Sequence, residues 1–516
     1  MNKDTTSDKS HYTILFAGGA FAALALAKRL VDHAKSYPFQ LLIIEKSDSC
    51  NGLAYNINQS PYVTTNNPAK TCSIDASDEN NFIDWSAKFG WPHSPDCYPP
   101  RYFFGKYLEH TLAKIISSAS NKRIQFNYIC GEEVVDCERQ KDGSYLVYSQ
   151  LKLEEKRIIY RANTVILATG NNKPNLPKFA KNLSPSRIVE NTMTVVNQKK
   201  ISAFDVDQNI AIIGSGFSAM DAMTIRFFEK IKPALDYAQN SASIRQQDIG
   251  KIYMISRRGL INYIPSEEPE ISVNYTLSNQ VCLTLVDTFF DSNKLIQLLN
   301  QEFRRGESLG YTKHQVVLAL DNVLIELLEK LSSDSERHKF IKDYWTVLHA
   351  HQNELQEPSA KIFQLLEQEE ILQVMEGHIK GNIHMEGEDV VIEFEENREP
   401  LKVDAVINTA GLEHSYEELV HQNALLTNLE KRGYISPHRK TNLGLEVNER
   451  YEAINRDGFS MPNLHPVGRL IEGEAIYKKF GLWFTGNSGI RSIRNMCAEL
   501  APIILQDIEL KSNSVI

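Results

Sequence analysis

Residues 13–23 (TILFAGGAFAA) and residues 209–219 (NIAIIGSGFSA) decide the fold of this chain. The two segments align without a gap, and each is an apolar run followed by a glycine-rich turn and a helical pattern. This succession predicts a strand, a tight turn and a helix, which together open a βαβ unit. Two copies are much more specific than one, so we expect an α/β fold with two Rossmann-like dinucleotide-binding domains.

The spacing of small residues in the second copy meets the three requirements of a dinucleotide-binding turn. Gly214 permits the sharp turn, Gly216 lets a pyrophosphate approach the backbone, and Ala219 lets the helix pack closely on the strand. The first copy has Ala20 in place of the second glycine, and this methyl group either weakens the phosphate site or is tolerated by a relaxed loop. The candidate residues are Gly18, Gly19, Ala20, Phe21 and Ala22 in the first turn and Gly214, Ser215, Gly216, Phe217 and Ser218 in the second.

The end of the following strand distinguishes the two nucleotides. Residues 40–45 (QLLIIE) end in Glu45, and a carboxylate there accepts hydrogen bonds from ribose hydroxyls and repels a phosphorylated ribose. Residues 251–259 (KIYMISRRG) instead deliver Ser256, Arg257 and Arg258, and guanidinium groups match phosphate oxygens in paired hydrogen bonds. Paired surface arginines are usually only solvated, but their position after a dinucleotide-binding strand favours binding. We therefore predict FAD at the first turn and NADPH at the second.

Composition and charge exclude several other classes. The 516 residues carry a formal net charge of −9, so no overall attraction to nucleic acid or anionic membranes is expected. Residues 1–10 lack the apolar core of a signal peptide and no stretch is apolar enough to span a bilayer, which predicts a cytoplasmic protein. The seven cysteines form no CxxC pair. His349 and His351 are explained by a helix surface, so no metal site is predicted.

Beyond the glycine turns, further segments resemble the FAD-NAD(P)-binding family of bacterial proteins, which is related in plan to flavin-dependent N-hydroxylating monooxygenases. The segments are residues 52–55 (GLAY), 66–69 (NNPA), 100–101 (PR), 105–108 (GKYL) and 256–259 (SRRG), with Ser73 and Trp345. Ala20, His349 and His351 depart from the pattern. The resemblance implies that residues 66–70 lie along the flavin ring and that Arg101 lies near the cofactor or substrate, which adds Asn66 and Arg101 to the candidates. A purely structural Asn-Asn-Pro turn is the alternative.

Two small-residue turns suggest where the chain crosses between domains. Residues 165–170 (VILATG) and 406–411 (VINTAG) resemble crossing points of two-dinucleotide flavoproteins, which adds Gly170 and Gly411. Residues 463–469 (NLHPVGR) resemble the strand that contacts the ribityl phosphate, which adds Gly468, although Arg469 stands where many such enzymes have aspartate. We expect an FAD-binding domain over 11–200 and 400–516, and an NADPH-binding domain over 205–400. A helical insert is expected at about 290–370, with the leucine-rich stripe of residues 318–331 in its core.

The resemblance implies an FAD-dependent, NADPH-using oxidoreductase, specifically a monooxygenase. Oxygen would pass from a flavin hydroperoxide to a small nucleophilic substrate, for which an amine is one candidate. The expected partners are that small-molecule substrate and molecular oxygen. Because the cofactor supplies the difficult chemistry, no catalytic side chain is required and none is assigned. Two alternatives stay open: an oxygen-independent reductase with the same cofactors, and a non-catalytic binding protein on a flavoprotein scaffold. The oligomeric state and the substrate are not assigned, although residues 483–494 are expected to contribute to its pocket.

Overall fold

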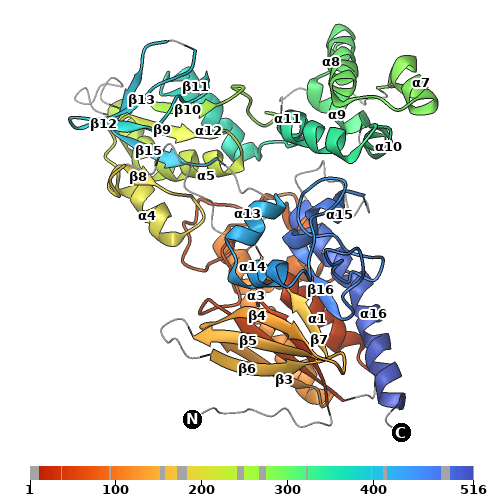
Figure 1. Ribbon diagram of the computed structural model, residues 1–516. Coiled ribbons are helices and arrows are strands. Elements are labelled where there is room, and N and C mark those ends of the chain that lie inside the picture. Colours follow the sequence, from red (N-terminus) through yellow and green to blue (C-terminus); the bar gives the residue numbers. More distant parts are fainter. Residues whose placement is uncertain are drawn as a thin grey trace.

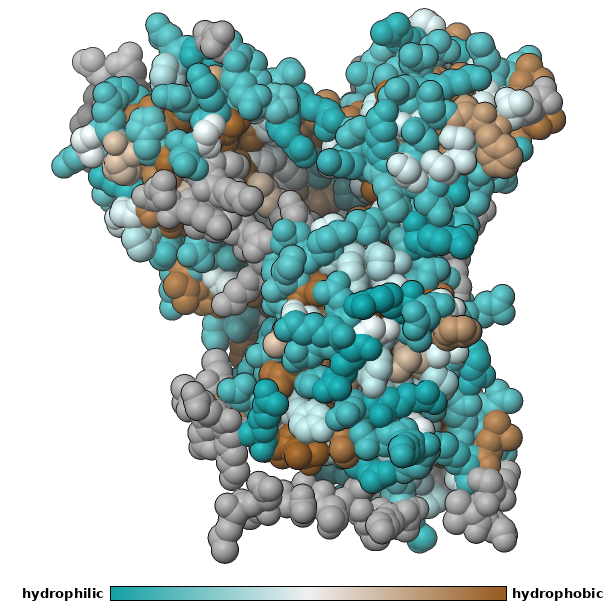
Figure 2. All heavy atoms as spheres, viewed as in Figure 1, coloured by the Kyte–Doolittle hydropathy of each residue, from teal (hydrophilic) through white to brown (hydrophobic). Residues whose placement is uncertain are grey.

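The computed structural model describes residues 11–35, 38–91, 94–151, 157–170, 180, 183–240, 249–265, 275–320, 323–396, 398–410, 415–477 and 488–514. The chain forms three lobes, namely a first sheet domain at the bottom of Figure 1, a second sheet domain and a helical insert. In the space-filling view a notch separates the two upper lobes (Figure 2). Within the described residues, no helix combines the length and the apolar character that crossing a membrane requires.

The first sheet domain is built on a five-stranded parallel sheet with the strand order β16-β7-β1-β2-β3. Its strands are β1 (Tyr12–Ala17), β2 (Phe39–Glu45), β3 (Gln125–Cys130), β7 (Thr164–Leu167) and β16 (Leu464–Pro466). Ile14 and Phe16 face one core and Leu15 and Ala17 face the other, as the two-residue period of a strand requires. Because both faces are covered, the inner strands β1 and β7 are buried along their whole length, which is typical of a parallel sheet, whereas the edge strand β3 is only partly buried.

Different elements cover the two faces of this sheet. On one face lie α1 (Phe21–His33), α3 (Arg101–Asn121) and α16 (Ile493–Ser514). On the other lie the antiparallel strands β4 (Glu132–Arg139), β5 (Tyr145–Leu151) and β6 (Arg157–Ala162), with α13 (Tyr416–His421) and α14 (Ala424–Lys431). Shorter elements are η1 (Ala69–Thr71), α2 (Asn81–Lys88), η5 (Gly468–Ile471), α15 (Glu472–Tyr477) and the π-helical turn η6 (Ser488–Ser492).

The second sheet domain repeats this plan. Its parallel sheet has the order β11-β10-β9-β15-β8. The strands are β8 (Ile188–Val189), β9 (Ile210–Ile213), β10 (Ile252–Ser256), β11 (Leu372–Glu376) and β15 (Ala405–Asn408). The helices α4 (Val195–Ala203), α5 (Phe217–Arg226) and α12 (Glu357–Gln368) cover one face, and α5 continues through the π-helical turn η3 (Phe227–Ile231) into α6 (Lys232–Asn240). The other face carries the antiparallel strands β12 (His384–Glu386), β13 (Asp389–Ile392) and β14 (Leu401–Val403).

The internal repeat is therefore larger than the two quoted segments. Strands β1, β2 and β3 lie side by side in the first sheet, as β9, β10 and β11 do in the second. In each domain a three-stranded antiparallel excursion then precedes the strand, β7 or β15, that returns beside β1 or β9. The chain crosses between domains at positions that differ from the expected limits of 200 and 400. Strands β8 and β15 both belong to the second sheet, because Val406 pairs with Ala211 on one side and with Ile188 on the other.

The helical insert has a core of its own. It consists of α7 (Asn279–Asp287), α8 (Ser292–Ser308), α9 (Lys313–Leu320), α10 (Leu324–Glu329) and α11 (Asp334–Gln352). Most of the leucine stripe is buried there, whereas Leu318 is exposed. The insert also contacts the first sheet domain, where Lys440 Nζ lies 2.5 Å from Glu329 Oε1. The last part of the expected insert forms α12, which packs in the second sheet domain through Phe363 and Leu366.

Candidate cofactor-binding sites

The two glycine turns have the same backbone geometry. Gly18 has φ +109° and Gly214 has φ +115°, and each lies at the bend between a strand and a helix. The N–H group of each donates to a carbonyl near the end of the next strand, Ile44 O or Ile255 O, over 2.8 Å. A Cβ atom on Gly18 would lie 2.2 Å from the backbone oxygen of Ala168. Both positions therefore require glycine for conformation and for space.

Ala20 does not alter the turn. It precedes α1 with φ −85° and ψ −157°, and Gly216 precedes α5 with φ −86° and ψ −165°. This extended conformation is available to any residue, so the backbone at Ala20 follows that at Gly216 despite the added methyl group. The methyl group of Ala20 faces Gly52, since a Cβ atom on that glycine would lie 2.8 Å from it.

Glu45 is held against the first turn by hydrogen bonds. Its buried carboxylate accepts the N–H of Gly19 at 2.7 Å through Oε2. Through Oε1 it accepts the N–H of Ser47 at 2.9 Å and the hydroxyl of Ser47 at 2.7 Å. A carboxylate offers about four lone-pair positions, so one stays available for a ribose hydroxyl.

Tyr128, on β3, also packs against the first turn. Its hydroxyl donates to Gly19 O over 2.8 Å, and a Cβ atom on Gly19 would lie 2.3 Å from that hydroxyl. Burial, together with the nearby carboxylate of Glu45, raises the pKa of Tyr128, so the hydroxyl stays a donor. Sequence reasoning missed this residue, because only the alignment of β3 beside β2 brings it to the turn.

The two arginines after β10 have different environments. Arg258 Nη1 donates to Thr346 Oγ1 over 3.0 Å, and its Nη2 donates to Asp343 O over 2.5 Å, so this side chain ties β10 to α11. Arg257 is exposed and forms no hydrogen bond or ion pair with any residue that the structure describes. The predicted pair is thus divided into one free guanidinium and one that is already engaged.

Two buried hydroxyls at strand ends have no hydrogen-bond partner in the described part of the chain. Ser256 Oγ lies at the end of β10, and Thr169 Oγ1 lies beside Gly170, which has φ +68°. Leaving such a group unsatisfied costs about 1–3 kcal/mol, so both positions suit a ligand. In addition, a Cβ atom on Gly216 would meet nothing within 4 Å, which leaves the backbone of the second turn open. These features fit one dinucleotide at each turn.

The remaining candidates fall into two groups. Gly468 has φ +69° and begins η5, and a Cβ atom on it would lie 3.4 Å from the Cβ of Ala22 on α1. Arg469 Nη1 lies 3.0 Å from Glu472 Oε1. Gly411 lies outside the described residues, as do residues 483–487 of the segment expected to contribute to a substrate pocket.

Arg101 lies between the two sheet domains. Its Nε donates to Thr64 O over 2.9 Å, and its Nη2 contacts Asp221 Oδ2 at 3.0 Å and Asn66 Oδ1 at 3.5 Å. Asp221 belongs to α5, the helix that follows the second glycine turn. Burial raises the pKa of Asp221, and the adjacent Arg101 opposes that shift.

Residues 59–67 (QSPYVTTNN), here called the bridging loop, carry this contact into the second domain. Val63 is fully buried in the core formed by β9, α5 and α12, and Tyr62 stacks on Phe228 with ring centroids 4.6 Å apart. Gln356, at the start of α12, donates to Thr65 O over 2.5 Å. Asn66 therefore lies in a segment that joins the domains.

A cluster of metal-ligand side chains is not found among the residues placed in the structure. His349 Nδ1 lies 2.8 Å from Asn353 Nδ2. His351 packs against Phe303 with ring centroids 5.4 Å apart. Each of these histidines thus contacts a neighbouring side chain.

Comparison with known proteins agrees with this geometry. Residues 15–172 match the FAD-NAD(P)-binding family model. The matched residues include the first glycine turn, Glu45, Arg101 and the turn at Gly170. No curated protein matches the chain.

Three solved structures share the fold over almost the whole chain. Ornithine hydroxylase of Pseudomonas aeruginosa aligns with a TM-score of 0.54 at 13% identity, covering 96% of this chain and 99% of that one. Ornithine N-hydroxylase of Kutzneria sp. 744 aligns with a TM-score of 0.56 at 12% identity, covering 98% of this chain and 100% of that one. DfoA, the cadaverine monooxygenase of Erwinia amylovora, gives 0.57 at 12% identity, covering 96% and 94%. At such identities the likeness establishes the two-domain α/β fold.

Proposed function

We propose that this protein is an FAD-dependent oxidoreductase that accepts hydride from NADPH, and that it is a monooxygenase of a small nucleophilic substrate such as an amine. One observation carries the proposal. Two turns of matching geometry are followed by strand ends of opposite charge, with Glu45 after the first and Arg257 after the second. A carboxylate selects an unmodified ribose and a guanidinium selects a phosphorylated one.

In this proposal the first turn holds FAD. The backbone N–H groups of Phe21 and Ala22, at the start of α1, would bind the pyrophosphate, because helix N-termini combine free donors with a positive dipole end. Glu45 would bind the adenosine ribose. The unpartnered hydroxyl of Thr169 and the turns at Gly170 and Gly468 would contact the rest of the cofactor.

The second turn would hold NADPH in the same manner. Gly216 leaves room for the pyrophosphate, and the N–H groups of Phe217 and Ser218 begin α5. Ser256 and Arg257 would bind the 2′-phosphate, while Arg258 keeps the loop after β10 attached to the insert. Ser215 supports the same loop, because its hydroxyl donates to Leu260 O.

The flavin, when bound, supplies hydride acceptance and oxygen activation, which no protein side chain can provide. The chain's own residues bind and orient the two nucleotides, and the bridging loop holds the domains together. Support for a monooxygenase comes from the similar structures, which are an ornithine hydroxylase, an ornithine N-hydroxylase and a cadaverine monooxygenase. Their substrates are amines, which is the reason for placing an amine first.

The absorption spectrum of the purified protein tests the proposal. A flavin spectrum that is bleached by NADPH without oxygen, and more slowly by NADH, is expected. Oxygen uptake and peroxide release during NADPH oxidation, measured with and without amine substrates such as ornithine, lysine and cadaverine, then test the monooxygenase. Bleaching without oxygen uptake would leave an oxygen-independent reductase, and a protein that takes up no FAD would end the proposal altogether.

A further inference from the structure

Arg494, on the first turn of α16, is a buried cation whose positive charge is only weakly balanced by neighbouring groups. Its side chain is 4% exposed, and its Nη2 lies 3.1 Å from Glu79 Oε1. Its Nε and Nη1 atoms have no hydrogen-bond partner within the described ranges. Glu79 is a weak counter-ion, because 67% of its side chain is exposed to water. A buried guanidinium normally has its donors satisfied, so these two nitrogens are available to the acceptor atoms of a ligand, and the positive charge favours an anionic one.

The first turn of α16 lies beside the N-terminal end of α1, where the proposed function places the dinucleotide phosphates. Cys497, one turn further along, has its Sγ 3.6 Å from Ala22 O. A Cβ atom on Gly468 would lie 3.4 Å from the Cβ of Ala22 and 3.8 Å from Cδ1 of Ile493. The start of α16, the start of α1 and the turn after β16 are thus neighbours. Positive charge at this place adds to the positive dipole end of α1.

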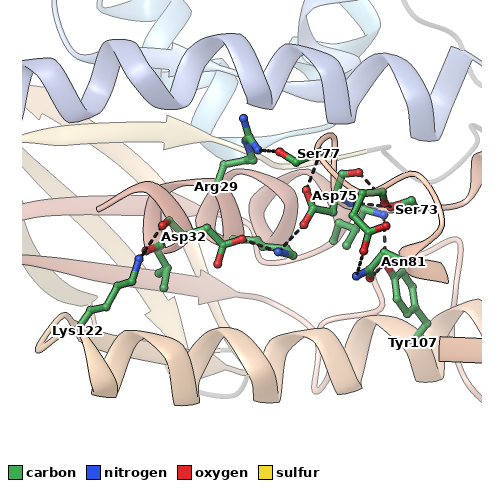
Figure 3. A network of polar contacts seen from close by, with 12 residues as sticks. Arg29, Asp32, Ser73, Asp75, Ser77, Asn81, Tyr107 and Lys122 are labelled. Carbon is green, nitrogen blue, oxygen red and sulfur yellow. Dashed lines mark hydrogen bonds and ion pairs between the residues drawn. The ribbon is translucent and has the colours of Figure 1, made fainter. Parts of the chain in front are cut away.

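The loop that carries Glu79 is fastened to the side of α1 (Figure 3). Lys28 Nζ lies 2.7 Å from Asp75 Oδ2. The hydroxyl of Ser73 donates to Asp78 O over 2.6 Å, and the hydroxyl of Tyr107 donates to Asn81 Oδ1 over 2.7 Å. Hydrogen bonds thus fix the chain on both sides of residue 79. Glu79 orients the Arg494 side chain through Nη2 and makes no contact with Nε or Nη1 of that arginine.

We propose that Arg494 binds a phosphate group of the dinucleotide held at the first turn, together with the N-terminus of α1. The inference deepens the proposed function and rests on it for the identity of that dinucleotide. It assigns the anion to one named side chain that neither the glycine turn nor the strand ends predict. Glu79 then acts as a positioning residue.

The test compares flavins that differ in their phosphates. Apo-protein is titrated with FAD, FMN and riboflavin, with the quenching of flavin fluorescence as the readout. Replacing the guanidinium (Arg494→Gln) should weaken FAD binding tenfold or more and leave riboflavin binding unchanged, while Arg494→Lys should retain part of the affinity. The matched control Lys511→Gln, which removes an exposed positive charge from the last turn of the same helix, should leave FAD binding unchanged. Circular dichroism and the melting temperature check that each variant folds.

A second readout does not depend on the flavin. Inorganic pyrophosphate should raise the melting temperature of the unmodified apo-protein and should compete with FAD, and both effects should vanish in Arg494→Gln. Equal FAD affinity in the Gln variant, or equal losses for riboflavin and FAD, would overturn the inference while leaving the proposed function intact. Failure of the unmodified protein to bind FAD would instead refute the proposed function, and the pyrophosphate experiment would still test Arg494.

Discussion

The guanidinium of Arg101 lies 3.0 Å from the carboxylate of Asp221, and this ion pair joins α3 of the first sheet domain to α5 of the second. The two side chains are only 12% and 13% exposed. The bridging loop surrounds the pair, since Arg101 also binds Thr64 O. The domain contact is therefore built from buried polar groups as well as from the apolar Val63, and polar groups of this kind fix one geometry when they are all satisfied.

Replacing Arg101 by methionine should destabilise the protein by about 3 kcal/mol, because removal of one partner leaves a buried carboxylate unpaired. Burial raises the pKa of Asp221 because it disfavours the charged carboxylate, and Arg101 opposes that rise, so loss of Arg101 should raise the pKa further. A raised carboxyl pKa stabilises the fold at low pH, and that contribution is lost as the pH rises through the folded pKa. The defect measured by urea unfolding should therefore be larger at pH 8 than at pH 5.

The matched variant Asp221→Asn separates charge from packing. It removes the ionisable group, so combining it with Arg101→Met should abolish the extra pH dependence. The double variant should also lose less stability than the sum of the two single variants. A pH-independent loss in Arg101→Met would contradict the role given to the ion pair.

Arg257 and Arg258 should separate into a binding residue and a structural residue. Arg257→Ala should raise the Michaelis constant for NADPH about tenfold or more, since a charge-assisted phosphate contact contributes about 1.5–3 kcal/mol. The constant for NADH and the melting temperature should not change. Arg258→Ala should lower the melting temperature, because it loses the hydrogen bonds to Thr346 and Asp343 O. Steady-state kinetics with both nucleotides and thermal melts check this, and equal effects of Arg257→Ala on NADPH and NADH would refute the assignment.

Neighbouring positions in the first turn should respond in opposite ways. Gly19→Ala should abolish FAD binding or folding, because its Cβ would lie 2.3 Å from the hydroxyl of Tyr128 and 3.0 Å from the Cβ of Glu45. Ala20→Gly should leave FAD binding unchanged or tighten it, because the backbone there is already that of Gly216. Fluorescence titration with FAD measures both. Weaker binding in Ala20→Gly would show that the methyl group supports the site.

The helical insert should open in acid. Burial, with a smaller effect of Lys313, lowers the pKa of His351 to about 4. A histidine whose pKa is lowered by folding stabilises the folded state at pH values above the pKa of the unfolded state. This contribution is lost as the pH falls from about 6.5 to 4. Allowing for partial exposure, the loss amounts to about 2 kcal/mol. Hydrogen exchange of residues 292–352 at pH 7 and pH 4.5 should detect it.

In that experiment His351→Gln should weaken the acid response of the insert, whereas His384→Gln, which changes an exposed histidine on β12, should not. If the acid response of His351→Gln were unchanged, other titratable groups would be responsible for the opening of the insert.

Much of the fold follows from local patterns. The apolar runs, the glycines at 18 and 214 and the helical periodicity predicted two Rossmann-like units, because each of these features depends on neighbours in the sequence. The two-residue strand β8 carries no such pattern, and only its pairing with β15 places it in the second sheet. The expected domain limits therefore missed it.

The sequence by itself determined that two dinucleotide turns exist, and that an acid follows one of them and arginines follow the other. Only the tertiary structure decided that Arg101 pairs with Asp221, that the described residues engage Arg258 but not Arg257, and that Tyr128 covers the first turn. Backbone turns are set by steric limits within a few residues. The partner of a long side chain is set by which elements pack beside it, here 120 residues away in the case of Arg101.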